Sequence, residues 1–306
     1  MDDLTVLYIA GYGRSGSTVL DVLLGGHARA VSVGELVFLG SEWKSEDRKC
    51  ACGRPYESCP FWEKLFEDTR GAKALEEIVR DIEHRRALPR LLLDAHTEEE
   101  KSEYRWQIRR LYEYIAQQED VNIVVDSSKS GRYAAGRFWA LRRVAGLDVR
   151  VLHLVRDGRS VLRSVVQKGT NWGVEGHRDE QNLLATRTTI GWVLANGLTR
   201  MLGKALDGDR YRRIRFEDLL ANPASVLRRI ESFAGLDLSS VIRRVSSEQL
   251  FPVGHNVGGN RVRHDDAIQL RRREGGRQDP WKGLDLHHRV LFRLLAQWMN
   301  SALGYE

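Results

Sequence analysis

The sequence predicts an α/β fold with a central parallel sheet and helices on both faces. Short apolar stretches rich in β-branched residues alternate along the chain with stretches of helical periodicity. This alternation is typical of parallel strands joined by crossover helices. The chain has 306 residues, 42% of them hydrophobic, and shows neither an internal repeat nor a low-complexity linker. We therefore expect one domain over residues 1–306.

The predicted elements follow one another in a regular order. The strands are predicted at residues 5–10, 122–125, 150–155 and 211–216. Helices are predicted over residues 63–118, 180–205 and 286–303. Further helices are predicted to begin after Ser17, after Gly158 and at Pro223, and another to end at about residue 145. Residues 41–62 lack periodicity and are interpreted as an irregular insertion, and residues 252–283 as a long polar loop.

The first strand ends in a glycine-rich motif, Gly11-x-x-x-x-Gly16-Ser17-Thr18. Its spacing is that of a P-loop, whose backbone N–H groups and helix N-terminus bind phosphate oxygens. Ser17 replaces the lysine that a nucleoside triphosphatase needs, which argues against ATP or GTP hydrolysis. Arg14 supplies a cation inside the loop instead. The alternative is an ordinary strand–turn–helix whose glycines serve only the turn.

A second basic motif, Arg156-Asp157-Gly158-Arg159, lies where another strand gives way to a helix. Arg156 could hold a phosphate through two hydrogen bonds. Ser164 and Lys168 are one helical turn apart and share a helix face. Two anion sites at the carboxyl ends of one sheet indicate a ligand with two separated phosphate groups. For Lys168 by itself, a solvated basic helix is the alternative.

Together these motifs resemble the family of sulfotransferases that depend on PAPS (3′-phosphoadenosine 5′-phosphosulfate). The segment similar to the family's 5′-phosphosulfate loop consists of Gly13, Arg14, Ser15, Gly16, Ser17 and Thr18. Arg156 and Ser164 match its 3′-phosphate site, and residues 215–219 with Asn222-Pro223 resemble a segment that many members carry after a late strand. The resemblance implies a P-loop-like three-layer fold, PAPS as donor with PAP as product, and no required metal.

Within the family the chain is most similar to the tyrosylprotein and carbohydrate type. Arg14-Ser15-Gly16 stands where the cytosolic phenol and steroid type favours Lys-Ser-Gly. The tyrosylprotein pattern carries an arginine in place of Lys168. Gly34-Glu35 follows Arg14 by 21 residues, and a Gly-Glu at this distance supplies the catalytic base of the tyrosylprotein enzymes. The resemblance therefore implies that Glu35 is the base.

The chemistry of sulfuryl transfer favours the same residues. The acceptor loses a proton as it attacks in line, which a carboxylate such as Glu35 can accept. The leaving phosphate needs cations, and the candidates are Arg14 and Lys129, which ends the turn after the second predicted strand. Glu35 as a helix cap or surface acid, and Asp126 as a simple turn cap beside Lys129, are the alternatives.

The loop at residues 252–283 is expected to cover the cofactor. In many family members a glycine-rich loop near this position closes over the 3′-phosphate, and this likeness assigns Asn260, Arg261 and Arg263 to cofactor binding. Trp281 either packs the loop, stacks on adenine or belongs to the core.

The three cysteines, Cys50, Cys52 and Cys59, all lie in the irregular insertion. They could be three of four zinc ligands, but the nearest candidates for a fourth, His27 and His84, could approach only through folding. A redox pair or buried thiols are favoured, and no metal site is predicted. The insertion has no counterpart in the tyrosylprotein pattern and could shape the acceptor pocket.

Charge and hydropathy limit the kinds of ligand, location and partner that we expect for this protein. The chain has 48 Lys and Arg against 42 Asp and Glu, which suits anionic ligands. It shows no signal-peptide pattern and no apolar window of membrane-spanning length, so we expect a soluble, cytoplasmic protein. Its arginines lie at strand ends rather than along one helix stripe, so no nucleic-acid partner is expected. A non-enzymatic module that binds a nucleotide or nucleic acid is the alternative to an enzyme. The acceptor is a hydroxyl or amine of a small-molecule, carbohydrate or phenolic compound; a P-loop small-molecule kinase is the alternative function.

Overall fold

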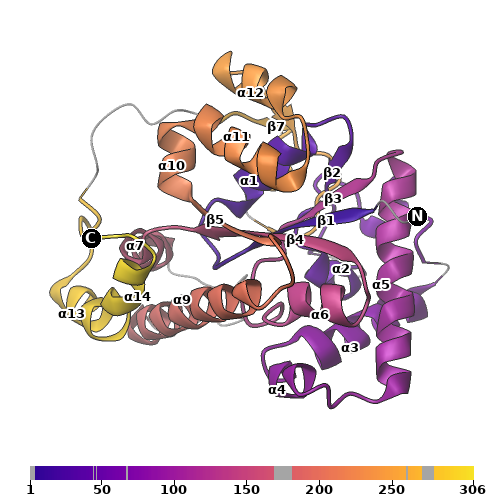
Figure 1. The fold of residues 1–306 in the computed structure, drawn as a ribbon, viewed down its shortest axis with the longest axis horizontal. Helices are drawn as coiled ribbons and strands as arrows, with labels where there is room; N and C mark the ends of the chain where they lie inside the picture. Colours follow the sequence, from indigo (N-terminus) through magenta and orange to yellow (C-terminus); the bar gives the residue numbers. More distant parts are fainter. Residues whose placement is uncertain are drawn as a thin grey trace.

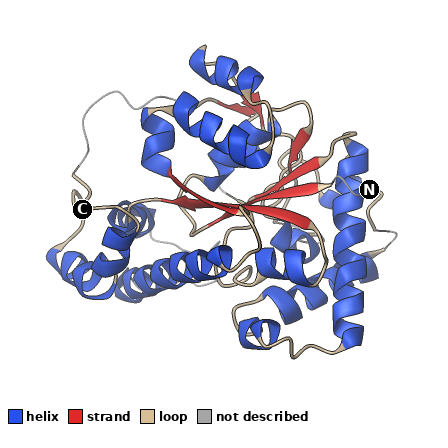
Figure 2. Ribbon diagram, viewed as in Figure 1, coloured by secondary structure: helices blue, strands red, loops and turns tan. Residues whose placement is uncertain are grey.

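A five-stranded parallel sheet forms the centre of the protein (Figure 2). The computed structural model describes residues 4–43, 45, 47–66, 68–168, 181–259, 261–270 and 279–306, with the backbone alone at 181, 182 and 261. The strands are β1 (Thr5–Ala10), β2 (Ala30–Ser32), β3 (Ile123–Asp126), β4 (Asp148–Val155) and β5 (Tyr211–Arg215), in the order β2-β3-β1-β4-β5. Each neighbouring pair is parallel, so all the carboxyl ends lie at one edge of the sheet.

Helices cover both faces of the sheet (Figure 1), which confirms the predicted three-layer α/β fold. One face carries α1 (Ser17–Gly25), α10 (Phe216–Ala221), α11 (Pro223–Ala234) and α12 (Ser239–Ser246). The other carries α2 (Leu39–Glu42), α3 (Thr69–Glu83), α4 (Leu88–Leu92), α5 (Glu98–Gln118) and α6 (Arg137–Arg143). A third apolar cluster joins α7 (Gly158–Lys168), α9 (Gln181–Lys204), α13 (Leu286–Leu295) and α14 (Gln297–Ala302).

The strands are apolar at almost every position because both of their faces are buried. In β1, Val6 and Tyr8 point into the layer of α3, α5 and α6, whereas Leu7 and Ile9 point into the layer of α1 and α11. A strand at the centre of a doubly covered sheet needs apolar side chains on both faces. This explains why a continuous apolar run, rather than an alternating one, identified β1 in the sequence.

The predicted strands are confirmed, with ends that shift by one or two residues. The strand β2 was not predicted, because three residues are too few to carry a periodic signal. The charged stretch of residues 63–118 forms the three helices α3 to α5. The single closing helix predicted over 286–303 is wrong: it divides into α13 and α14 at Ala296, whose φ of −130° is not helical.

The segments expected to be irregular contain short ordered elements. Within and beside the cysteine insertion lie the 3₁₀ turns η1 (Leu36–Phe38) and η2 (Tyr56–Ser58). The predicted long loop is shorter than expected, because β6 (Phe251–Pro252) and β7 (Ala267–Ile268) pair antiparallel and enclose η3 (Arg261–His264). Within the described ranges, no helix combines the length and the apolar character needed to cross a bilayer.

A buried ionic network joins the sheet to the helices beneath it. Arg137 on α6 has no exposed surface and donates to Asp126 at the end of β3 at 2.9 Å and to Glu83 at the end of α3 at 2.7 Å. Tyr104 on α5 donates to Glu83 at 2.8 Å. Because both carboxylates are fully buried, the Arg137 guanidinium that contacts both supplies their counter-charge.

We expect Arg137→Met to lower the free energy of unfolding by about 3–5 kcal/mol, because it leaves two buried carboxylates without a cation. Equilibrium denaturation in urea measures the change. Arg143→Met on the same helix is the control, since Arg143 pairs with Asp207 at 3.4 Å at the surface, and an exposed pair contributes about 0–1 kcal/mol. Equal losses in the two variants would contradict the assigned role of the network.

Candidate active site

The loop after β1 forms a glycine-rich turn at the carboxyl edge of the sheet, which we name the anion-binding turn after the ligand that its sequence predicts. Gly16 caps α1 with a φ of 88° and no side-chain bond, so the first N–H groups of the helix point outward. A Cβ on Gly16 would lie 2.2 Å from the ring of Phe216, which makes glycine necessary here. Ser15 Oγ is buried and has no hydrogen-bond partner among the described residues. An unpaired hydroxyl beside a helix N-terminus fits a phosphate or sulfate oxygen.

The second motif is joined directly to this turn. Arg156, just after β4, donates to the carbonyl of Arg14 at 2.7 Å, and its guanidinium lies 5.3 Å from the ring centre of Phe216. Ser164 and Lys168 follow on α7, the former half-buried and the latter exposed. The structure thus brings the two predicted anion-binding motifs together through Arg156.

The neighbouring Arg159 has a structural role. Its guanidinium donates to Asp157 at 2.9 and 2.7 Å and to the carbonyl of Glu306 at 2.5 Å. The segment after β5 supports the same region, because Glu217 accepts from the backbone N–H of Asp157 at 3.1 Å and from the hydroxyl of Tyr305 at 2.7 Å. Of the two arginines in the motif, Arg159 therefore holds the chain's end and Arg156 faces the anion-binding turn.

Glu35 and Lys129 form a buried ion pair at the ends of neighbouring strands. Glu35 follows β2, Lys129 follows β3, and these two strands are paired. The residues are 4% and 9% exposed. Burial raises the pKa of Glu35 above its usual range, and the charge of Lys129 opposes the rise. A carboxylate in this setting is a stronger base than one in water and keeps a cation beside it.

A glycine turn lies against Glu35. The backbone N–H of Glu35 donates to the carbonyl of Val257 at 2.6 Å, next to a parallel bridge between Gly34 and Val257. A Cβ on Gly259 would lie 3.3 Å from Glu35 Oε1 and 3.6 Å from Thr18 Oγ1. Gly259 therefore lies close to both the buried carboxylate and the anion-binding turn, which places these two groups at one site.

The structure describes the side chain of only one of the three loop residues that were predicted to bind the cofactor. Asn260 lies outside the described residues, and Arg261 is described by its backbone in η3. Arg263 is buried and its guanidinium lies 3.7 Å from the carboxylate of Glu42, and its part in cofactor binding stays a prediction. Trp281 packs edge-on against Phe292, with ring centres 5.8 Å apart, and so belongs to the third apolar cluster.

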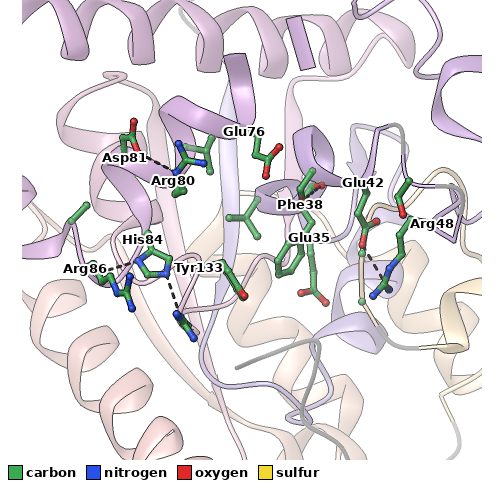
Figure 3. Close-up of a pocket in the computed structure, with 18 of the residues that line it drawn as sticks. Glu35, Phe38, Glu42, Arg48, Glu76, Arg80, Asp81, His84, Arg86 and Tyr133 are labelled. Carbon is green, nitrogen blue, oxygen red and sulfur yellow. Dashed lines mark hydrogen bonds and ion pairs between the residues drawn. The ribbon is translucent and has the colours of Figure 1, made fainter. Parts of the chain in front are cut away.

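A cavity of about 860 Å³ opens beside Glu35. Figure 3 shows Glu35, Phe38 and Tyr133 around its centre, with the rings of Phe38 and Tyr133 5.5 Å apart. Its charged lining consists of Glu35, Glu42, Glu76, Asp81, Glu100, Arg48, Arg80, Arg86, Arg90 and Arg132. Burial and the nearby Arg132 lower the pKa of His84 to about 4, so this lining histidine is neutral. The cavity therefore presents charges of both signs around an aromatic wall.

Sequence reasoning missed several residues of this region. Gly259 was noted in its segment, but nothing in the sequence indicated that it lies against Glu35. Phe38 and Tyr133 carried no signal, because a single aromatic residue most often belongs to the core. The partner of the cysteines is His255, whose Nδ1 lies 3.2 Å from Cys59 Sγ across 196 residues of chain. Neither His27 nor His84 belongs to this cluster.

The comparisons with known proteins agree with this geometry. A model of the sulfotransferase family matches residues 7–240. Carbohydrate sulfotransferase 5 of Mus musculus is 34% identical over 110 residues, which are 30% of this chain and 26% of the relative. Carbohydrate sulfotransferase 6 of Homo sapiens is 33% identical over 110 residues, with the same two shares of 30% and 26%. The match thus spans only 26% of the length of these curated relatives.

Two solved structures share the fold. The sulfotransferase domain from the curacin biosynthetic pathway has a TM-score of 0.54 at 21% identity, over 99% of this chain and 98% of that one. A sulfotransferase from Mycobacterium avium has a TM-score of 0.52 at 14% identity, over 100% and 78%. Since the family model covers most of the chain and includes the anion-binding turn, Glu35, Lys129 and Arg156, the chain belongs to the sulfotransferase family.

Proposed function

We propose that this protein transfers the sulfuryl group of PAPS to a hydroxyl or amine of an acceptor, with Glu35 as the general base. The observation that carries the proposal is the place of Gly259, close to both the Glu35 carboxylate and the Thr18 hydroxyl of the anion-binding turn. A base and an anion site that face the same small volume are what in-line group transfer from a phosphosulfate requires.

The residues present fit PAPS as the donor. The outward N–H groups of α1 and the unpaired Ser15 hydroxyl suit the 5′-phosphosulfate, with Gly13, Gly16, Ser17 and Thr18 in the same turn. Arg156, Ser164 and Lys168 would hold the 3′-phosphate. When bound, PAPS supplies the sulfuryl group and a phosphate leaving group.

Glu35 and Lys129 would act as a coupled pair. Burial raises the pKa of Glu35 and so strengthens the carboxylate as a base. The charge of Lys129 keeps this carboxylate ionised before the substrate to be sulfated binds. Once Glu35 takes the acceptor's proton, Lys129 loses its counter-ion. Its positive charge is then available for the negative charge that grows on the leaving group, together with Arg14.

The cavity beside Glu35 would hold the acceptor. Its volume of about 860 Å³ is in the range of small-molecule sites. The charged lining favours a polar, hydroxyl-rich acceptor over an apolar one, and the aromatic wall of Phe38 and Tyr133 suits the face of a sugar ring or a phenol. A carbohydrate acceptor is our first candidate, because the curated relatives include carbohydrate sulfotransferases. The cytoplasmic location stays a prediction.

Arg156→Ala is expected to weaken the binding of PAP, the desulfated cofactor, by at least about tenfold, because it removes a charge-assisted contact to phosphate. Isothermal calorimetry without magnesium measures the affinity. The control is Arg163→Ala on α7, whose guanidinium donates to the carbonyl of Asp279 at 3.3 Å in an exposed contact. Absence of PAP binding to the folded wild type, or ATP hydrolysis that requires magnesium, would favour the kinase alternative instead.

Glu35→Gln is expected to lower kcat by ~10²–10⁴-fold while PAP affinity stays within a factor of about two, because the amide cannot accept the acceptor's proton. Steady-state sulfation of a screened acceptor gives kcat, and calorimetry gives the affinity. In the wild type, kcat/KM should fall as the pH drops through the raised pKa of Glu35, since only the ionised carboxylate is a base.

The pH profile also tests the coupling of the pair. Lys129 opposes the rise in the pKa of Glu35, so in Lys129→Met the loss of kcat/KM should begin at a higher pH than in the wild type. An unmoved acid limb in this variant, or full activity in Glu35→Gln, would remove Glu35 as the base and leave the family assignment intact.

A further inference from the structure

Three cysteines and one histidine from distant segments gather at one point beside the active site. Cys59 Sγ lies 3.6 Å from Cys50 Sγ, 3.7 Å from Cys52 Sγ and 3.2 Å from His255 Nδ1. All four ligand atoms lie within 4.8 Å of one another. The cysteines are free thiols. The cysteine insertion and the segment after β6 therefore meet through these side chains.

The separations match a tetrahedron of ligands around one metal ion. With Zn–S bonds of about 2.3 Å and a Zn–N bond of about 2.0 Å, neighbouring ligand atoms lie about 3.5–3.8 Å apart. Thiols are weak donors and weak acceptors, so hydrogen bonding alone gives little reason to bring three together beside an imidazole nitrogen. We propose that Cys50, Cys52, Cys59 and His255 bind one Zn²⁺ ion as a structural site.

The ligand set selects zinc and a structural role. Soft thiolates with one imidazole in a tetrahedral arrangement are typical of Zn²⁺. Four protein ligands close the coordination sphere, so the ion has no position left for a substrate or a reactive water. Cys50 and Cys59 are buried and Cys52 is exposed, which gives the ion a path from solvent. Binding would release the thiol protons to solvent, because the thiolate is the ligand.

The backbone around the cysteines has the form of a ligand-holding turn. Cys50 donates its N–H to the carbonyl of Arg54 at 2.9 Å and accepts at its own carbonyl from the N–H of Gly53 at 2.9 Å. Gly53 has a φ of 83°, which lets the chain reverse directly after Cys52. Such a turn allows the sulfur atoms of Cys50 and Cys52 to point toward the same ion.

Two aromatic residues hold His255, one at its ring and one at its backbone. Its ring is stacked on Phe61, with centres 5.2 Å apart and planes at 13°. Its carbonyl accepts from Trp62 Nε1 at 2.9 Å. Both neighbours follow Cys59 by a few residues, so the segment that carries a sulfur ligand also orients the nitrogen ligand. Contacts that orient a ligand in this way are usual around protein metal sites.

The proposed ion would position the glycine turn at the active site. His255 precedes Gly259 by four residues. Between them, the carbonyl of Asn256 accepts from the N–H of Ala51 at 3.2 Å, and its side chain donates to Asp21 on α1 at 2.9 Å. The ion would thus tie the cysteine insertion to the segment that lies against Glu35. This differs from the sequence-based expectation that the chain holds no metal.

The first test is the metal content of the full-length protein purified without chelators. Inductively coupled plasma mass spectrometry should find about one zinc per chain in the wild type and less than about a tenth in Cys59→Ser and His255→Ala. His287→Ala is the matched control: His287 belongs to the other group of potential ligands, Asp285, His287 and His288, among the described residues. This variant should keep its zinc. Loss of zinc in the control alone would overturn the assignment.

A second test does not depend on whether the variants fold. Wild-type protein stripped of metal and supplied with Co²⁺ should show the visible bands of a tetrahedral cobalt site and a near-ultraviolet thiolate charge-transfer band. Zinc removal should also speed hydrogen exchange at residues 255–259, because the turn loses an anchor. A metal-free wild type that gives neither band with Co²⁺, whether its thiols titrate freely or form a disulfide, would overturn the proposal.

Discussion

The guanidinium of Arg137, buried between Asp126 and Glu83, is the interaction on which the site depends. A charge without solvent must be balanced by its neighbours, so the end of β3 and the end of α3 are held in one arrangement. Asp126 also accepts from the backbone N–H of Ser128 at 2.9 Å, which shapes the turn that ends at Lys129. Lys129 adopts a φ of 68°, a strained conformation for a side chain other than glycine. The buried network thus holds the lysine that faces Glu35.

Close packing of aromatic rings on glycine constrains the anion-binding turn in a similar way. Phe216 lies where a side chain on Gly16 would be, and the guanidinium of Arg156 lies over the same ring. Arg156 also holds the carbonyl of Arg14. The segment after β5 therefore packs against both anion-binding motifs. This gives a physical reason for the Arg-Phe-Glu-Asp-Leu segment that the sequence showed beside the two motifs.

Two different parts of the structure position Lys129 and Glu35, and the proposed zinc site belongs to one of them. The sheet and the Arg137 network hold Lys129 from one side. The segment from His255 to Gly259 holds Glu35 from the other, through the hydrogen bond from the Glu35 N–H to the Val257 carbonyl. The Glu35–Lys129 pair thus lies between two segments that hold it from opposite sides, next to the cavity.

The features that depend on residues close together in the chain could be predicted from the sequence. The strand of residues 5–10 could be predicted because a strand covered on both faces is a continuous apolar run. The turn after it could be predicted because its glycines have a fixed spacing. The three-residue β2 was missed because so short a strand has no period. Glu35 and Lys129 could each be proposed alone, but their pairing could not, since they are 94 residues apart and meet only because β2 and β3 are neighbours.

The sequence by itself determined the fold class, the anion-binding turn and the family likeness, because each depends on residues close together in the chain. The tertiary structure alone decided which partner each side chain takes. Arg156 and Arg159 lie three residues apart in one motif, yet one reaches the carbonyl of Arg14 and the other is held by Asp157. His255 reaches Cys59 only after the segment following β6 packs on the insertion. Partner choice depends on strand order and long-range packing, which no local pattern encodes.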